Sequence, residues 1–281
     1  MSDKSYRIRL PENLPPCRGE EGYEEYLEQR MNQPPCGMPR GPYRRTSAKV
    51  WYPVASEVVR TPRTAIVPVE YDLIFLVDGM EPKGYEELLE RLDKAASEIG
   101  YPVFFRSGQT SAKHDWDHAH CVVRCREDFK KAIPALVEYS CMGFPEQSWE
   151  ILMVRQFLDV KAICRKDSGT PISREFRFFI EDGAVSHVQP YWPEHAVAGH
   201  TEETGWEERL REMSVLSTDE YEYLKAETLK VAQAVPGDWS VDWLQDRNGD
   251  WWMIDMADAA VSYCWVPEFS VVADTECGLK P

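Results

Sequence analysis

The sequence lacks the signatures of several large classes of protein. It contains no apolar run of the roughly 18 residues that a membrane-spanning helix needs, so we expect no membrane span and no membrane partner. The motifs GxxxxGKS/T, GxGxxG and GxSxG, which mark P-loop proteins, dinucleotide-binding proteins and serine hydrolases, are also absent. If this protein binds phosphates, it must hold them with side-chain cations and flexible loops.

Basic residues are scarce, because 32 Lys and Arg stand against 48 Asp and Glu and give a formal net charge of −16. This balance disfavours binding to duplex nucleic acid, whose affinity comes mainly from cations that neutralise phosphates. The eight cysteines are scattered without a CxxC pair, and several lie in apolar segments, which indicates a reduced, cytoplasmic protein. Cys17 and Cys36, in proline-rich stretches, are the exception and could pair under oxidising conditions.

The composition suits a packed globular protein, since 43% of the 281 residues are hydrophobic and 12% are aromatic. Residues 1–60 are irregular and form an N-terminal extension, in which the basic stretch 37–45 could also contact an anionic substrate. We place two lobes at 61–142 and 143–281, with a break near Gly143. Apolar spacing predicts strands at 64–69, 71–77, 101–105, 118–124 and 149–158, helices at 81–99, 127–139 and most of 201–235, and hairpins at 174–191 and 239–256. This mixture favours an α+β protein with mainly antiparallel sheets flanked by helices.

The hairpin at Trp239–Asp258, WSVDWLQDRNGDWWMIDMAD, carries two aspartates inside apolar, aromatic strands. Asn-Gly in its turn tolerates the positive φ that tight hairpins need. An ionised carboxylate at Asp242 or Asp255 costs several kcal/mol, by rough estimate, if it is buried without a partner. Something positive should therefore face these two side chains: either a hard cation such as Mg²⁺, which prefers oxygen ligands, or nearby arginines.

Four cations precede this hairpin in an order that indicates an anion site. Arg106 ends a predicted strand, and Lys113 lies in the polar loop that follows it. Arg174 and Arg177 are three residues apart on one predicted strand, so they face opposite sides, and Arg177 shares a face with Glu175. Arginine is suited to bidentate binding of phosphate or carboxylate. For each cation taken alone, pairing with a surface acid is the alternative.

A second group of residues of the types that bind metals lies at 114–125, from the end of the predicted polar loop to the start of the next predicted helix. Cys and His are the ligands that zinc prefers, but the usual CxxC spacing is missing, and on a strand the histidines and cysteines would face opposite sides. Structural zinc and ordinary strand residues are both left open at this point. The residues are His114, Asp117, His118, His120, Cys121 and Cys125.

The order of cations, apolar strand and paired acids resembles the ATP-grasp superfamily over most of the chain, from about Thr64 to Trp265. The strand pair REFRFFIEDGAV at 174–185 is close to the pattern E-x-R-x-F-x-x-D/N-G-x of one branch. That branch contains cell division cycle protein 123 and many phage and actinobacterial proteins. In this superfamily two α+β lobes close on ATP, and the last hairpin holds Mg²⁺.

The resemblance implies a role for each matching position. Arg106, Lys113 and Arg177 are the expected catalytic cations, and Arg106, Lys113 and Arg174 are expected to bind the cofactor. The stretch VRQFLD at 154–159 matches the adenine hinge, in which the backbone of Gln156 and Leu158 reads adenine and Asp159 takes the ribose hydroxyls.

Asp242 and Asp255 match the metal-binding acids. The family usually has Asn where this chain has Ala257, and Asp258, the nearest oxygen, is the expected replacement ligand. This departure leaves the number of bound Mg²⁺ ions and turnover itself open.

The function that the resemblance implies is ATP-dependent ligation of a carboxylate to an amine, of the peptide-bond-forming type, through an acyl phosphate. The substrate is then a small-molecule or peptide carboxylate. Two alternatives stay open: an ATP-binding chaperone or assembly module that acts on a protein partner with little turnover, and a phosphotransferase acting on a hydroxyl. An acidic, aromatic-rich surface also fits protein recognition.

Overall fold

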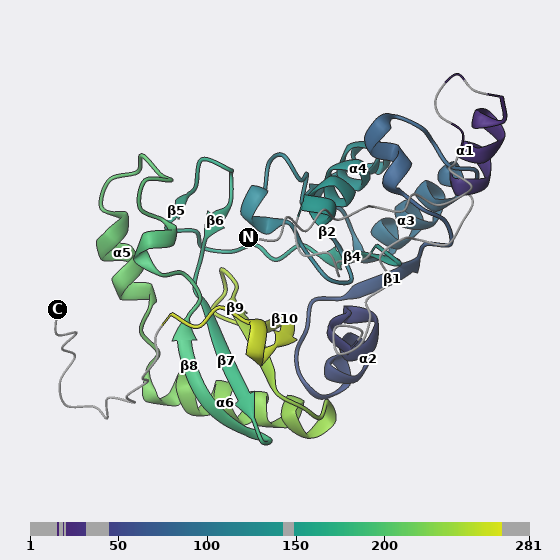
Figure 1. Ribbon diagram of the computed structural model, residues 1–281. Coiled ribbons are helices and arrows are strands. Elements are labelled where there is room, and N and C mark those ends of the chain that lie inside the picture. Colours follow the sequence, from purple (N-terminus) through teal and green to yellow (C-terminus); the bar gives the residue numbers. More distant parts are fainter. Residues whose placement is uncertain (1–15, 17–18, 20, 32–44, 143–148, 266–281) are drawn as a thin grey trace, which may run out of the picture.

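The computed structural model describes residues 16, 19, 21–31, 45–142 and 149–265 (Figure 1). These residues form two lobes, each built on a four-stranded sheet. Within the described residues, all strand pairings in these sheets are antiparallel. The α+β prediction with mainly antiparallel sheets is thereby confirmed. Cys17, Cys36 and Gly143 lie outside the described residues, and of the basic stretch 37–45 only Arg45 lies within them.

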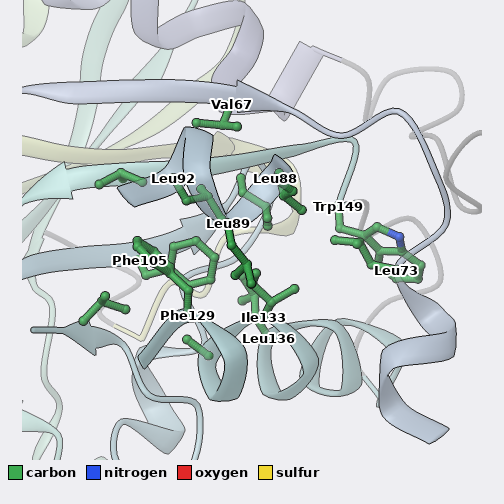
Figure 2. Packing of buried hydrophobic residues seen from close by; sticks show 14 of the residues in the cluster. Val67, Leu73, Leu88, Leu89, Leu92, Phe105, Phe129, Ile133, Leu136 and Trp149 are labelled. Carbon is green, nitrogen blue, oxygen red and sulfur yellow. The ribbon is translucent and has the colours of Figure 1, made fainter. Parts of the chain in front are cut away.

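The first lobe has the strand order β1-β4-β2-β3 and packs α3 and α4 against one face of its sheet. On α3, Leu88, Leu89, Leu92 and Ala96 repeat at helical spacing and are fully buried, and they meet Phe129 and Ile133 of α4 (Figure 2). The elements are β1 (Thr64–Pro68), α3 (Tyr85–Ile99), β2 (Val103–Ser107), β3 (Val122–Val123), α4 (Arg126–Met142) and β4 (Ile151–Gln156).

The second lobe has the strand order β10-β9-β7-β8. One face of this sheet packs against α6 and α2, and the other face is turned towards the first lobe. Ser217 caps α6 through a capping box with Glu220, which explains why the predicted long helix divides at this point. The elements are α2 (Ala48–Val58), β7 (Glu175–Glu181), β8 (Ala184–Pro190), α6 (Thr218–Ala234), β9 (Trp239–Gln245) and β10 (Trp251–Asp258).

Strand β4 joins the two cores. Leu152 and Val154 belong to the first core, whereas Ile151 and Met153, on the opposite face, belong to the second. Helix α2, which lies within 1–60, also packs into the second core through Trp51. A third, small cluster unites β5 (Cys164–Arg165), β6 (Pro171–Ile172) and α5 (Trp206–Met213), while α1 (Tyr23–Met31) lies at the edge of the first lobe.

Two predicted strands differ from the structure. Instead of a strand at 71–77 there is a short 3₁₀ helix, η2 (Ile74–Asp78): Asp72 accepts a hydrogen bond from the Ile74 amide at 3.1 Å, and Gly79 ends the turn with a φ of 75°. The predicted strand 118–124 shortens to Val122–Val123, because the residues before it form a turn after η3 (Lys113–Asp115). The remaining short helices are η4 (Glu194–Ala196) and η5 (Ala259–Val261).

The described residues contain no helix that has both the length and the apolar character required to cross a membrane.

Candidate functional site

A cleft of about 550 Å³ lies between the lobes. The residues that line it include seven Lys or Arg and four Asp or Glu, a net charge of +3 in a chain whose formal charge is −16. A concentration of cations in one hollow of an acidic protein favours an anionic ligand. The basic lining residues are Arg106, Lys113, Arg124, Arg155, Lys161, Arg165 and Arg247.

A row of polar side chains crosses the second sheet on the face turned towards the first lobe. The strand register sets Gln189 opposite Arg177, Arg177 opposite Asp242, and Asp242 opposite Asp255. Arg177 and Asp242 form a bidentate pair, with Nε–Oδ1 and Nη2–Oδ2 distances of 2.7 and 2.9 Å. Coulomb attraction to Asp242 raises the pKa of Arg177 against the opposing effect of burial.

The position of Asp255 depends on an irregularity in β10. Pairing with β9 runs regularly from Trp251 to Met253, skips Ile254, and resumes with Asp255 opposite Asp242. The extra residue turns Asp255 towards the cleft while both Met253 and Met256 stay in the core. Without this bulge, Ile254 would stand opposite Asp242.

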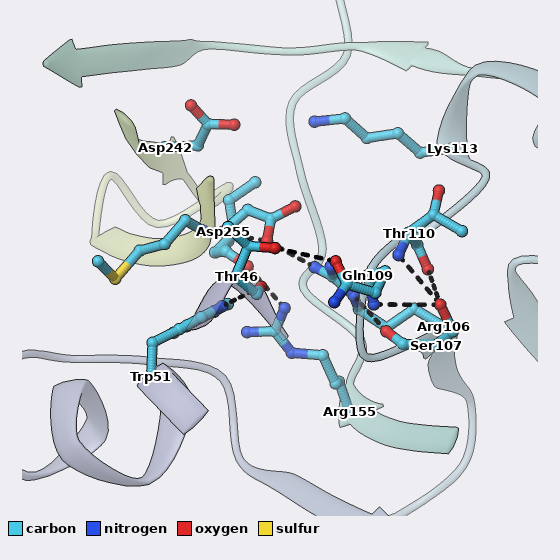
Figure 3. Close-up of polar contacts among 12 residues, drawn as sticks. Thr46, Trp51, Arg106, Ser107, Gln109, Thr110, Lys113, Arg155, Asp242 and Asp255 are labelled. Atoms are coloured by element: carbon cyan, nitrogen blue, oxygen red, sulfur yellow. Dashed lines mark hydrogen bonds and ion pairs between the residues drawn. The ribbon is translucent and has the colours of Figure 1, made fainter. Parts of the chain in front are cut away.

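Arg106 of the first lobe binds Asp255 of the second (Figure 3). Its Nη1 lies 2.9 Å from Asp255 Oδ1, and its side chain is 3% exposed against 29% for Asp255. Oδ1 also accepts the amide of Met256 at 3.0 Å, whereas Oδ2 makes no hydrogen bond to any described residue. One oxygen of Asp255 is therefore left for a ligand.

Lys113 crosses from the first lobe to Glu175 on β7, with an Nζ–Oε1 distance of 2.7 Å. Its ammonium also lies 3.9 Å from the centre of the Tyr191 ring, and the same ring faces the Arg177 guanidinium at 4.8 Å. Burial raises the pKa of Glu175 to about 7, although the Lys113 ammonium acts in the opposite direction. Lys113 is thus held at the wall of the cleft beside a carboxyl group whose pKa burial raises.

The loop between Arg106 and Lys113 has a fixed base. Ser107 Oγ accepts the amides of Gln109 and Thr110 at 3.2 and 3.0 Å. Position 108 requires glycine, because a Cβ there would lie 2.8 Å from both Ile151 Cγ1 and Ser47 Oγ. The Gly108 carbonyl accepts a hydrogen bond from the Ala48 amide at the start of α2. The loop that carries Lys113 is consequently tied to both lobes.

The predicted hinge residues line the cleft, but their backbone groups are not equivalent. The Gln156 amide donates to Arg63 O at 2.7 Å, and the Gln156 side chain accepts the Arg63 amide. The backbone of Leu158 makes no hydrogen bond within the described residues, so its amide and carbonyl can form hydrogen bonds with a ligand. Asp159 binds Arg247, with Oδ2–Nε and Oδ1–Nη2 distances of 2.6 and 3.1 Å, which lowers the pKa of Asp159 and ties the β9–β10 turn to the hinge.

Arg174 does not share the cleft with the other predicted cations. Its guanidinium binds Glu220 at the start of α6, on the opposite side of the sheet, and Gln245 at 3.0 Å. The side chain of Arg174 therefore faces away from Arg177, as the strand periodicity predicts, and its contacts are structural.

Asp258 is also separated from the other two aspartates. It binds Arg45 at 2.7 Å and caps η5 by accepting the Ala260 amide at 3.0 Å. Arg45 in turn stacks on Trp239 at 4.6 Å, so the described end of the basic stretch packs against the second lobe. Both carboxylate oxygens of Asp258 are occupied by these contacts, and Asp258 is not among the residues that line the cleft.

The structure adds one buried cation that the sequence reasoning missed. Arg155, on β4, is 3% exposed, and its Nη1 donates to the Ile254 carbonyl at 2.6 Å while Nε donates to Thr64 Oγ1 at 3.1 Å. Burial and the nearby Arg106 lower the pKa of Arg155 to about 10. A charged residue in the apolar strand WEILMVRQFL was the available signal, the same signal that marked the two aspartates.

The carboxylates of Asp242 and Asp255 fit the donor type and number that Mg²⁺ takes from protein, because this ion is usually held by one or two carboxylates together with phosphates and water. Both oxygens of Asp242 accept hydrogen bonds from Arg177, so Asp242 would have to release one of them to bind the ion. No cluster of three or more His, Cys, Asp or Glu side chains able to hold a metal occurs within the described ranges. This also applies to the group from His114 to Cys125 and disfavours the zinc alternative.

Neither a protein-family model nor a curated protein sequence matches the chain. Among solved structures, Cdc123 from Schizosaccharomyces pombe is similar, with a TM-score of 0.50 and 15% identity over 76% of this chain and 83% of that one. D-alanine–D-alanine ligase from Bacillus anthracis, complexed with ATP, matches with a TM-score of 0.40 and 12% identity. The ATP-grasp ligase PsnB, complexed with a minimal precursor, matches with 0.41 and 9%.

The chain covers about half of each ligase structure, 52% and 51%, but most of Cdc123. The described part of the chain therefore shares its fold with Cdc123.

Proposed function

We propose that the protein binds Mg·ATP in the cleft between its lobes and uses it to join a carboxylate to an amine. The observation that carries this proposal is that Arg106 and Lys113 from one lobe and Asp255 from the other line one cleft of positive net charge, with Asp242 opposite Asp255 in the sheet. The phosphates of ATP would pair with the two cations, and a divalent metal ion would pair with the two carboxylates.

The adenine is best placed at the apolar end of the cleft, beside the hinge. Phe104 and Phe157 from the first-lobe side and Leu244 and Ile254 from the second line this end and can cover the two faces of a planar base. The backbone amide and carbonyl of Leu158 are available to form hydrogen bonds with the edge of the adenine. Asp159 reaches the ribose only by releasing Arg247.

The phosphates then run towards Arg106 and Lys113, with Asp242 and Asp255 as the residues that would hold Mg²⁺. When bound, Mg²⁺ neutralises charge on the phosphate oxygens. The cations of the chain orient the triphosphate and stabilise the negative charge that spreads over the transferred group. Loss of one such cation should lower the rate by roughly 10²–10³.

The chemistry that fits this placement has two balanced steps. A substrate carboxylate oxygen forms a bond to the γ-phosphorus as the bond to the β-phosphate oxygen breaks, which gives an acyl phosphate and ADP. The amine nitrogen then bonds to the acyl carbon, inorganic phosphate departs, and the amine loses one proton. The excess of positive charge in the cleft suits the carboxylate substrate as well as the nucleotide.

A second function is ATP binding with little turnover, in a module that acts on a protein partner. Ala257 stands where the resembled family usually has a third metal ligand, and Asp258 is held by Arg45 instead of facing the cleft. A phosphotransferase that acts on a hydroxyl uses the same cleft and differs only in the acceptor.

The deciding experiment measures thermal stabilisation by Mg·ATP and by a non-hydrolysable analogue, and then ADP release with carboxylates offered with and without amines. Amine-dependent ADP release identifies the ligase. Binding without turnover across a broad panel identifies the module, and ADP release with a hydroxyl acceptor identifies the phosphotransferase.

Lys113→Met should abolish the stabilisation, whereas the matched control Lys49→Met, an exposed lysine 3.6 Å from Glu150, should retain it. No stabilisation of the parent protein by any nucleotide, with or without Mg²⁺, would refute the proposal.

A further inference from the structure

The bulge in β10 is held from the opposite lobe. Ile254 is the residue that the β9–β10 register skips, and its carbonyl accepts a hydrogen bond from Arg155 Nη1 at 2.6 Å. Just before the bulge, the Met253 amide donates to Arg60 O at 2.9 Å, so the segment that leads into β1 holds the other side. The irregular part of β10 is therefore bonded to groups outside its own sheet.

Arg155 is itself fixed on three sides. Its Nε donates to Thr64 Oγ1 on β1 at 3.1 Å, and its guanidinium lies 5.8 Å from the ring centre of Tyr52 on α2. The Tyr52 hydroxyl is anchored to Pro62 O at 3.0 Å. With 3% of the residue exposed, the Arg155 side chain has little freedom, which is the property that a positioning group needs.

Burial and the neighbouring Arg106 oppose the charge of Arg155, whereas Asp255 and Tyr52 favour it. Arg106 lies close enough to repel it, and Nη2 of Arg155 is buried without a hydrogen-bond partner among the described residues. An apolar residue would fill an apolar strand at lower cost, since a buried charge must be compensated. The bond to Ile254 O is the contact through which Arg155 reaches β10 of the second lobe.

We propose that Arg155 is a positioning residue: by holding the Ile254 carbonyl it fixes the bulge that sets Asp255 opposite Asp242, and so it sets the metal affinity of this pair. The inference rests on the proposed function, because it assigns Arg155 to the support of the proposed Mg²⁺ site (Figure 3). Arg155 acts here through the backbone of Ile254 and through Asp255.

Two variants separate the charge of Arg155 from its hydrogen bond to the Ile254 carbonyl. Arg155→Lys keeps the charge but cannot bond Thr64 and Ile254 together as the guanidinium does, and Arg155→Met removes both. The matched control is Arg63→Met, because Arg63 is an exposed arginine of the neighbouring segment whose guanidinium bonds to Ile99 O.

The first measurement is the Mg²⁺ concentration needed for half-maximal binding of an ATP analogue. Both Arg155 variants should raise it by roughly 10- to 100-fold, the usual effect of removing a group that orients a metal ligand. Arg155→Lys should leave metal-free nucleotide affinity within about threefold of the parent because the charge remains. An unchanged Mg²⁺ requirement in Arg155→Lys would overturn the inference in favour of charge alone.

The second measurement needs no nucleotide. Hydrogen exchange in the Arg155→Lys protein should rise over 251–258 relative to 175–190, whereas general destabilisation raises both segments. Equal exchange in the two segments would also overturn the inference. If the parent binds no Mg-nucleotide, the proposed function fails, and the exchange result still decides whether Arg155 holds the bulge.

Discussion

The pair between Arg106 and Asp255 gives the sharpest test of the candidate site. Replacing Asp255 by Asn removes the negative charge but keeps the shape. Breaking a fully buried pair costs about 3–5 kcal/mol. Arg106 is 3% exposed but Asp255 is 29% exposed, and the Asn amide oxygen can still accept a hydrogen bond, so we expect a loss of about 2 kcal/mol. For a protein of 281 residues that corresponds to a Tm decrease of roughly 3–4 °C.

The matched control is Asp250→Asn in the turn of the same hairpin. Asp250 lies 3.1 Å from Arg60, and both side chains are about half exposed, at 50% and 46%. An exposed pair contributes about 0–1 kcal/mol, so this variant should melt close to the parent. Equal melting temperatures for the two variants would show that burial of Arg106 does not govern the cost.

Nucleotide binding should separate the two roles of Asp255. Asp255→Asn should lose most of its Mg²⁺-dependent binding, because the metal loses one of two carboxylates. Metal-free ATP should bind at least as well as to the parent, since the carboxylate no longer competes for Arg106. Isothermal titration with and without Mg²⁺ measures both, and parental affinity for Mg·ATP in the variant would refute the metal assignment.

Three further outcomes follow from the site and the core. Burial raises the pKa of Glu175 to about 7 from an ordinary value of 4.5, so between these pH values the folded chain holds a proton that the unfolded chain has released. The contribution of this group to stability therefore falls as the pH rises from 4.5 to 7. Glu175→Gln should flatten the dependence of Tm on pH in this range, and an unchanged profile would contradict the shift. Gly108→Ala should cost about 1–3 kcal/mol in chemical denaturation, because its Cβ would lie 2.8 Å from Ile151 and Ser47; a neutral result would mean that the loop base is not fixed. Burial raises the pKa of Cys121 to about 12, so a short alkylation pulse at pH 8 should label the exposed Cys125 and spare Cys121 in mass-spectrometric mapping, and equal labelling would contradict the burial.

The sequence contained enough information to predict the hairpin that carries the two aspartates. Asn248-Gly249 fixed the turn, where Gly249 has a φ of 88°, and alternation fixed which side of β9 is apolar. The bulge at Ile254 could not be predicted, because one extra residue in a strand changes the register without changing the residue types around it.

The cations illustrate the same limit. Periodicity correctly separated Arg174 from Arg177, but it could not show that Arg174 faces Glu220 on a helix 46 residues further along the chain. Arg155 stands in an apolar strand as Asp242 and Asp255 do, but the sequence does not show that its guanidinium bonds to the Ile254 carbonyl. Strand position indicates the face of a side chain, whereas its partner depends on tertiary packing that a single strand does not encode.

Under the proposed function, the placement of the charges would let one cleft take two ligands of opposite sign. Arg106 and Lys113 come from the first lobe, and their carboxylate partners Asp255 and Glu175 come from the second. ATP alone would bring its negative charge next to these carboxylates, and a metal ion alone would bring its positive charge next to the cations. When both bind, each can take the place of the charge that it displaces, so every buried group keeps a partner of opposite sign. On this proposal, the groups that pair the lobes without ligand are also the groups that favour joint binding of nucleotide and metal.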